Sequence, residues 1–234
     1  MGRELQAIDR SAAESLIRWW IESGVEVAVG ETPRAWLRGP GQPPAPSPAP
    51  VSAPKPPADL HAFQQWLASA PDLPMNRTGA IRVAPFGPEK PKLMLLFDQP
   101  DGTDAGAAAP ISGDAWVLAK RMIAAIGIAP DEAYAASLGC FYSPGARFGR
   151  DDLARCASIA RDHVRLAQPE RLILFGDAPA RALFGEPLAR ARGRIHRVEG
   201  VRAVATFHPR WLLQRPSDKA LAWRDLMLLM SEAD

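Results

Sequence analysis

The sequence predicts an α/β protein, a three-layer α/β/α sandwich with a central, mainly parallel four-stranded sheet. Four short apolar runs read as strands, at residues 93–97, 134–139, 171–175 and 201–205. Helical periodicity returns between them, and strands that are apolar throughout are typical of a parallel sheet covered on both faces. The 234 residues, 47% apolar and 23% charged, are enough to bury such a core.

The N-terminal part of the chain differs from the rest. Residues 1–38 form a Trp-rich helical appendage, in which a capping-box pattern at 11–14 opens a helix that ends near Gly24. A short strand is expected at 24–29. Residues 39–58 are a Pro-rich linker, since nine prolines fall between positions 40 and 57. The apolar residues of the helix are expected to pack on the main domain or on a protein partner. The linker could bind a proline-reading domain, although a plain spacer is the simpler interpretation.

Residues 59–234 form the main domain, and its elements follow in order. The patterns predict helices at 60–70, 113–126 and 151–167, a short helix ending at Gly185, and a closing helix at 217–230 capped by Ser217. Loops are expected at 98–110 and at 206–216. Parallel strands deliver the residues after their carboxyl ends to one rim, here Asp98, Ser137, Gly176 and His208.

The loop that begins at His208 is the strongest functional candidate. Pro209 keeps the histidine out of a helix, and two large apolar residues, Leu212 and Leu213, stand between cations. A histidine at a strand end is also compatible with a purely structural hydrogen bond, and Asp98 is compatible with a helix cap. The sequence alone leaves these alternatives open.

Charge and cysteine content limit the partners and the compartment. Formal net charge is +2, but residues 140–225 hold 16 Lys and Arg against 9 Asp and Glu, and the remainder 12 against 17. A basic C-terminal half suits a polyanion such as DNA, although a solvated Arg-rich surface is the alternative. With two Cys, no membrane-length apolar run and no signal-peptide pattern, a cytoplasmic monomer is expected.

The C-terminal residues resemble a known family. His208-Pro209 with Trp211-Leu212-Leu213, Pro216, Lys219 and Trp223-Arg224-Asp225-Leu226 is similar to the C-terminal motif of the uracil-DNA glycosylase superfamily, in its iron–sulfur branch. The strand and helix at 172–185 and the turn Arg192-Gly193-Arg194 match as well. The resemblance covers roughly residues 60–230 and implies a three-layer α/β/α fold.

The resemblance implies a chemistry and its residues. Such enzymes flip a uracil out of the duplex and hydrolyse its N-glycosidic bond, which leaves an abasic site. His208 matches the residue that stabilises the departing uracil anion, and Asp98 the acidic residue of the first motif. Base contacts are expected from Gln99, from Ile111 in place of a stacking Phe, and from Ser137 in place of an Asn that reads the uracil edge. A hydroxyl supplies only part of an amide's hydrogen bonding.

DNA contacts follow from the same comparison. Arg210 to Arg215 matches the loop that enters the DNA, with Leu212 or Leu213 as the apolar wedge. The DNA-binding residues expected are Arg194, Arg210, Trp211, Leu212, Leu213 and Arg215.

The iron–sulfur cluster of the branch needs four Cys, and this chain has two. Cys140 and Cys156 have the spacing of the family's second pair, but no Cys stands where the first pair belongs. No cofactor and no metal site is therefore expected. The resulting hypothesis is a DNA repair glycosylase for uracil or a related damaged base, and the alternative is a weakened or inactive glycosylase-like DNA-binding protein.

Overall fold

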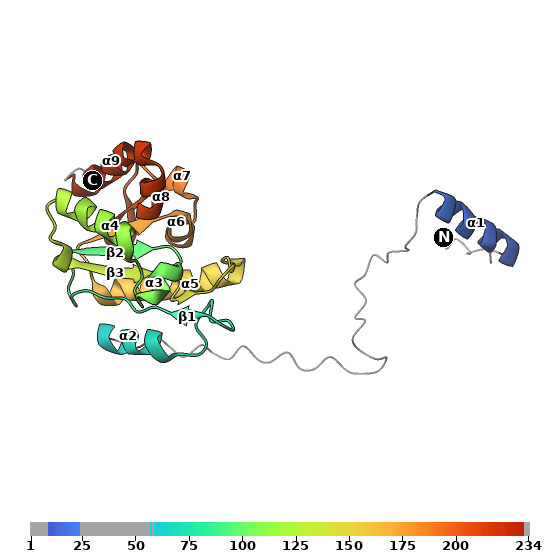
Figure 1. Cartoon of the computed structure of the whole chain (residues 1–234), viewed down its shortest axis with the longest axis horizontal. Helices are drawn as coiled ribbons and strands as arrows, with labels where there is room; N and C mark the ends of the chain where they lie inside the picture. The colour runs from blue at the N-terminus through green and yellow to red at the C-terminus, as the bar shows by residue number, and fades with distance from the viewer. Residues whose placement is uncertain (1–8, 24–56, 58, 232–234) are drawn as a thin grey trace, which may run out of the picture. The chain divides into compact units, whose positions relative to one another are not determined.

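The computed structural model describes residues 9–23, 57 and 59–231 (Figure 1). These residues fall into two units, each described by itself. The first holds α1 (Arg10–Glu22), which begins at Asp9, whose side chain accepts a hydrogen bond from the Ala12 N–H at 2.8 Å. The cap expected at Ser11 is therefore wrong by two residues. The strand at 24–29 and the linker lie outside the described residues.

The second unit contains the sheet. Its five strands are β2 (Leu93–Phe97), β3 (Ala133–Ser137), β5 (Arg171–Phe175), β6 (His196–Val198) and β7 (Val201–Thr206), in the order β3-β2-β5-β7-β6. The four expected strands are parallel to one another, and β6 adds an antiparallel edge that the sequence did not indicate. Because all four parallel strands end at one edge, the residues that follow them meet there.

Helices cover both faces of the sheet (Figure 1). Met94 and Leu96 of β2 belong to the hydrophobic cluster that also holds residues of α5 (Arg150–Ala167) and α6 (Asp177–Phe184). Leu93, Leu95 and Phe97 belong to the opposite cluster, with α4 (Gly113–Ala125) and α9 (Lys219–Met230). This alternation confirms the three-layer α/β class that the apolar strands predict.

Smaller elements complete the unit. They are α2 (Leu60–Ser69), β1 (Ile81–Arg82), α3 (Gly102–Gly106), η1 (Pro130–Glu132), β4 (Phe141–Tyr142), α7 (Leu188–Ala191), α8 (Pro209–Gln214) and η2 (Pro216–Asp218). β1 pairs with β4 as a separate two-stranded sheet. Residues 102–106 and 209–214, both expected to be loops, are helical. The closing helix begins at Lys219, because Ser217 lies within η2.

Gly87 lets an additional segment approach the edge of the sheet. Phe86 forms a single bridge with Ala135 of β3, and a Cβ atom at position 87 would lie only 2.6 Å from the Tyr134 Cα. A larger residue would push the segment away. Among the described residues, no helix is both long and apolar enough to cross a membrane.

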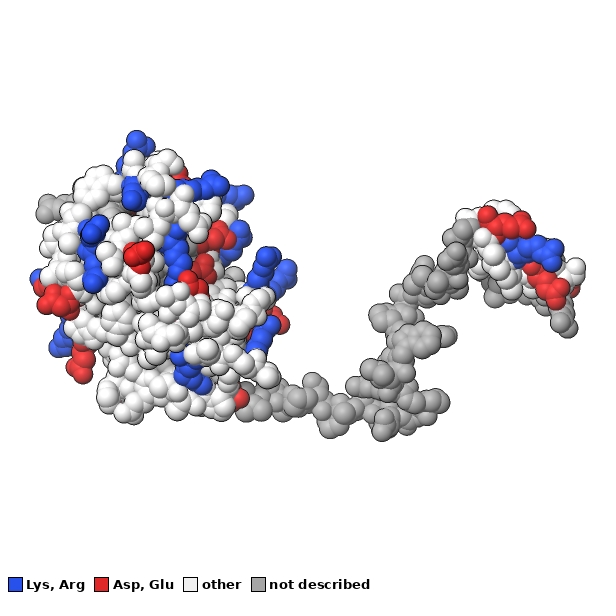
Figure 2. Space-filling model, in the orientation of Figure 1, with Lys and Arg blue, Asp and Glu red and all other residues white. Residues whose placement is uncertain are grey.

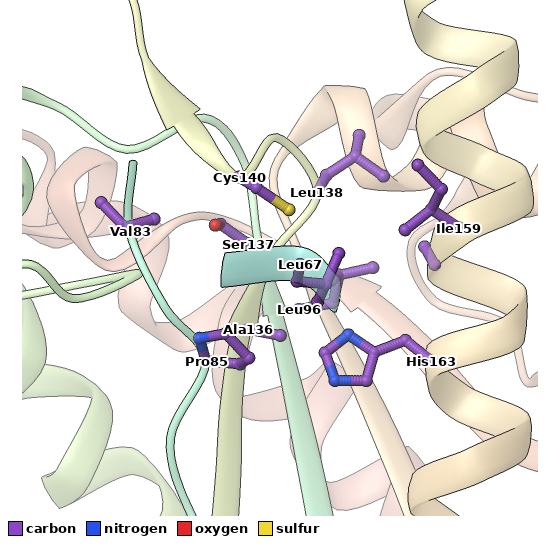
Figure 3. Close-up of a pocket in the computed structure, with 11 residues that line it drawn as sticks. Leu67, Val83, Pro85, Leu96, Ala136, Ser137, Leu138, Cys140, Ile159 and His163 are labelled. Carbon is purple, nitrogen blue, oxygen red and sulfur yellow. The ribbon is translucent and has the colours of Figure 1, made fainter. Parts of the chain in front are cut away.

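A buried polar chain joins α2, β3 and α5. Gln64 Nε2 donates to the Tyr134 hydroxyl at 2.9 Å, and that hydroxyl lies 2.8 Å from His163 Nε2. Since the tyrosine oxygen already accepts from Gln64, its own proton points to His163, which accepts as a neutral ring. Burial lowers the pKa of His163 to about 3. Figure 3 shows the ring beside a cavity of about 10 Å³, about the size of one water molecule.

This histidine makes folding stability depend on pH. Its pKa in the folded state lies below the usual 6.5, so the unfolded chain takes up the proton first as pH falls. The contribution is complete above pH 6.5 and is lost progressively toward pH 3. We expect urea unfolding at pH 5 to give a free energy lower by about 1–2 kcal/mol per buried histidine than at pH 7. In the variant His163→Gln, the difference in unfolding free energy between pH 5 and pH 7 should be smaller by this amount. Equal stability of the wild type at both pH values would contradict the buried, neutral state of His163.

Candidate active site

Asp98 follows β2 and faces the start of α6. Its Oδ1 accepts the Gln99 backbone N–H at 2.8 Å, and the Ala178 backbone N–H is a second donor to the carboxylate. Burial raises the pKa of this carboxyl, while these donors and the Arg210 charge oppose the rise. Gly176 has φ of 108°, and a Cβ there would lie 3.0 Å from Asp98 Oδ2. The glycine at the end of β5 therefore makes room for the carboxylate.

His208 is the N-cap of α8, directly after β7. Its Nδ1 accepts the Arg210 backbone N–H at 3.2 Å. Burial lowers the pKa of His208 to about 3, and the charge of Arg210 adds to this. The ring is therefore neutral at physiological pH, and its one proton must sit on Nε2 because Nδ1 is an acceptor.

Nε2 of His208 is buried and has no hydrogen-bond partner among the described residues. A buried donor without a partner costs about 1–3 kcal/mol, so such groups in folded proteins call for an explanation. A ligand oxygen in front of the ring would supply the missing acceptor. This observation favours a binding role for His208 over a purely structural one.

Asp98 and His208 line the same pocket, which has a volume of about 540 Å³. The volume is within the usual range for small-molecule sites. The other lining residues come from the ends of β5 and β7 and from α6, α7 and α8: Gly176, Asp177, Leu188, Ala189, Arg192, Phe207 and Trp211. The structure thus brings together the carboxylate and the imidazole expected to meet at this rim.

Phe207 and Arg192 form one wall of the pocket and Asp225 supports it, a role that the sequence analysis did not assign to them. The Arg192 guanidinium lies 4.0 Å from the centroid of the Phe207 ring. Asp225, almost fully buried, pairs with Arg192 at 2.8 Å and also accepts from Thr206 Oγ1 at 2.7 Å. In the sequence, only the position of Phe207 directly before His208 could have indicated that its ring lies beside the pocket.

The expected DNA-entering loop is helix α8. Pro209 stands at its first position, where a missing N–H costs nothing, and His208 caps it. Helical periodicity then separates the two leucines: Leu212 is 1% exposed and packs inward, whereas Leu213 is 42% exposed. The expectation that Leu212 contacts DNA is wrong, because its side chain is part of the core.

The three arginines expected to contact DNA differ in whether their charge is already paired with a carboxylate. Arg215 is exposed and lies 4.5 Å from the Trp211 ring centroid. Arg194 is exposed and pairs with Glu186. Arg210 pairs with Asp101 and Asp104, so its guanidinium is already bound by two carboxylates. On the visible face of the larger unit, Figure 2 shows Lys and Arg interspersed with Asp and Glu.

Comparison with known proteins decides the family. Residues 84–227 match the family model described as the uracil DNA glycosylase superfamily. This chain belongs to the uracil-DNA glycosylase superfamily. A protein named Type-4 uracil-DNA glycosylase from Pyrobaculum aerophilum is 21% identical over 181 residues, which are 73% of this chain and 92% of that protein.

Two further relatives extend the comparison. A second protein named Type-4 uracil-DNA glycosylase, from Archaeoglobus fulgidus, is 22% identical over 153 residues, 61% of this chain and 77% of the relative. A DNA polymerase of Bacillus phage SP01 is 23% identical over 148 residues, 62% of this chain but 16% of the polymerase. The resemblance first seen at residues 208–226 is thus confirmed at family level.

Three residues that the superfamily resemblance assigned to the base do not line the Asp98–His208 pocket. Ile111 is 1% exposed and packs in the hydrophobic cluster with Phe97. Ser137 donates to the Gly139 carbonyl at 2.9 Å and lines the small cavity beside His163 instead (Figure 3). Gln99 is half-buried next to Asp98, and its backbone N–H donates to the Asp98 carboxylate. None of the three is among the residues that line this pocket.

The cysteines do not fit the superfamily's iron–sulfur group. Such a cluster needs four Cys thiolates, and this chain has two Cys, Cys140 and Cys156. Cys140 packs on an apolar cluster built mainly from α2 and the segment after it: Phe63, Leu67, Ala70, Leu73, Met75 and Phe141. The described residues hold no group of three or more His, Cys, Asp or Glu that could bind a metal ion.

Proposed function

We propose that this protein excises uracil or a related damaged base from DNA by hydrolysing the N-glycosidic bond, leaving an abasic site. The observation that carries the proposal is the shared pocket of Asp98 and His208, in which Nε2 of the neutral histidine is an unsatisfied donor. Family membership supports the same reaction class.

His208 acts on the leaving base. As the bond between C1′ and the base nitrogen breaks, its electron pair moves onto the base and negative charge appears on the carbonyl oxygens. The Nε2–H of His208 donates to one of these oxygens, and it is held in place before the charge develops. The ring is already neutral, and a neutral imidazole gives up its remaining proton far less readily than an imidazolium, so it stabilises the anion without transferring that proton.

Asp98 acts on the sugar. The sugar ring gains oxocarbenium character as the base departs, and the fixed carboxylate stabilises this positive charge and orients the water that adds to C1′. That water gives up one proton, and the released base anion takes one up, so the products are the abasic sugar and the free base. Two backbone N–H groups hold the carboxylate in one orientation. No step passes through a metal cluster.

Leu213 is the wedge that fills the space left by the flipped base. It is exposed on α8, and the neighbouring pair of Trp211 and Arg215 at the same helix supplies an aromatic surface and a phosphate contact. Arg194 is a second phosphate contact, once its exposed pair with Glu186 opens.

The two leucines of α8 should respond in opposite ways to truncation. Leu213→Ala should leave the free energy of unfolding within about 0.5 kcal/mol and slow excision from duplex DNA more than from single strands. Leu212→Ala should destabilise the fold by about 2–5 kcal/mol, because it opens a cavity beside α4 and α9. Urea unfolding and excision assays on both substrates measure this, and equal effects of the two changes would contradict the assigned orientation of α8.

A second candidate is a glycosylase-like DNA-binding protein that does not release bases efficiently. It is favoured by the pocket lining, in which the described residues include no Asn or Gln side chain to read a uracil edge. Arg192 and Asp177 are the polar groups left for that task besides the two proposed catalytic residues.

Abasic-site formation separates the two candidates. A single-stranded and a duplex oligonucleotide with one uracil are incubated with the protein, and matched oligonucleotides with thymine serve as controls. Alkali-sensitive cleavage at uracil alone supports the proposed glycosylase. Tight binding to the same DNA without any cleavage supports the second candidate.

The organisation of the chain is a separate proposal. We propose that residues 1–38 are an appendage, joined through a linker at 39–58 to the glycosylase domain at 59–234, and that α1 binds a protein partner. Its support is the set of large apolar side chains that α1 exposes: Leu16, Ile17, Trp19, Trp20 and Ile21.

A further inference from the structure

We propose that Arg210 is a positioning residue that clamps the Asp98 segment to the His208 helix, and that it does not contact DNA phosphates. The proposal rests on the proposed function for its catalytic consequence. Arg210 is the second residue of α8, and its side chain crosses to residues that are more than 100 positions earlier in the chain.

The clamp is an ion pair with two carboxylates at α3. Nε of Arg210 lies 2.8 Å from Asp101 Oδ2, and its Nη2 donates to Asp104 Oδ2. Asp104 is fully buried (0% exposed), whereas Arg210 is partly buried. A buried carboxylate without its cation is strongly unfavourable, so a DNA phosphate could recruit this guanidinium only at a high cost.

The receiving side of the clamp is itself fixed. Asp104 also accepts from Ser112 Oγ at 2.8 Å and from the Asp101 N–H at 3.1 Å. Asp101 in turn caps α3 by accepting from the backbone of Thr103 at 2.8 Å. Asp101 follows Asp98 by three residues, so the ion pair attaches α8 to the segment that carries the catalytic carboxylate.

The backbone of the same residue orients the imidazole. The Arg210 N–H is the donor that His208 Nδ1 accepts, and this bond leaves the ring proton on Nε2. The ion pairs of the Arg210 side chain therefore hold the first turn of α8 in position. The position of this turn then keeps the Arg210 N–H on His208 Nδ1, which sets the tautomer of the His208 ring. A shift of about 1 Å at such a site is enough to lower a rate about 100-fold.

The charge of Arg210 reaches both catalytic groups as well. It lowers the pKa of Asp98 against the burial that raises it, with Asp177 of α6 acting in the opposite sense. It also lowers the pKa of His208, which Asp101 opposes. Loss of this charge should therefore move the acidic limb of the activity profile to higher pH, because Asp98 must lose its proton to act.

Four variants of the full chain test the clamp. Arg210→Met removes it, Arg210→Lys keeps the charge but not the two-carboxylate geometry, and Arg215→Met removes an exposed cation of the same helix end. Arg165→Met is the matched control, because this exposed arginine lies in the last turn of α5, near the start of β5 and at the opposite edge of the sheet. Each is assayed for single-turnover excision, for DNA affinity as a function of KCl concentration, and for the ¹⁵N signals of the His208 ring.

We expect Arg210→Met to lower the single-turnover rate at saturating DNA at least about tenfold, with partial recovery in Arg210→Lys. Its slope of log affinity against log salt should equal that of wild type and of Arg165→Met. Arg215→Met should reduce that slope by about 0.9, the value for one phosphate contact. The His208 ring should lose its uniform Nε2–H tautomer in Arg210→Met.

A reduced salt slope in Arg210→Met with an unchanged rate at saturation would overturn the proposal and make Arg210 a phosphate contact. An unchanged His208 tautomer in that variant would overturn it as well. The tautomer and the salt slope need no base release, so they decide the role of Arg210 even if wild type does not excise uracil.

Discussion

Replacing His208 with alanine should lower the rate of base release about 100- to 1000-fold and leave DNA affinity within about twofold. The Nε2–H donor is without a partner until a base carbonyl arrives, and its interaction strengthens as the base becomes an anion. Loss of one such donor typically has this magnitude, because it acts on the transition state more than on the bound substrate. Single-turnover excision at saturating DNA gives the rate, and fluorescence anisotropy gives the affinity.

His61→Ala is the matched control for this variant, since His61 is exposed on α2 and away from the pocket. Its rate should equal that of wild type. A His208→Ala variant with wild-type rate would remove the imidazole from the mechanism, and a comparable loss in both variants would point to a general effect on folding.

Asp98→Asn should lower the rate of base release by about 100-fold or more. The substitution keeps the size of the side chain and an oxygen for the Gln99 N–H, but it removes the negative charge that faces the sugar. In wild type the activity should fall as pH drops toward the raised pKa of Asp98, because the protonated acid cannot stabilise the sugar cation. This acidic limb should disappear in Asp98→Asn, whose residual activity would not follow the same titration.

Rates measured between pH 4.5 and 8 for wild type and Asp98→Asn provide the test, with Asp131→Asn as a control. Asp131 is exposed in η1, before β3 and at the opposite edge of the sheet. An identical pH profile in wild type and Asp98→Asn would exclude Asp98 as the titrating group.

The sheet could be predicted because its four parallel strands are almost purely apolar. A strand buried on both faces is apolar along its whole length, so each one can be recognised from its own residues, without knowledge of the strand it pairs with. Parallel strands end at the same edge of the sheet, which placed Asp98 and His208 together in the prediction. β6 was missed because it has only three residues, two of which, His196 and Arg197, are polar. An edge strand of this kind depends on pairing with β7, which local sequence does not encode.

Helix α8 shows where local reasoning failed. Residues 206–216 were expected to form a loop, with Pro209 keeping His208 out of a helix, yet proline is well accommodated in the first turn of a helix. The period of the helix buries Leu212 and exposes Leu213, so treating the segment as a loop left Leu212 among the residues expected to contact DNA.

The partners of Arg210 could not be predicted from sequence at all. An arginine beside a catalytic motif of a basic segment suggests a phosphate contact, and the carboxylates that bind it lie more than 100 residues away. Arg192 and Asp225 matched the family motif, but their roles could not be assigned from sequence, because they pair with each other across 33 residues. Long-range ion pairs depend on the tertiary fold, and only the structure brings their members together.

The central claim is that one base occupies the pocket between Asp98 and His208. A crystal structure with DNA that carries a non-hydrolysable deoxyuridine analogue tests it most directly. We predict that the base lies in this pocket, with one carbonyl oxygen within about 3 Å of His208 Nε2 and the sugar C1′ beside the Asp98 carboxylate. A flipped base bound elsewhere, or a base in the pocket with His208 Nε2 still unpaired, would contradict the claim.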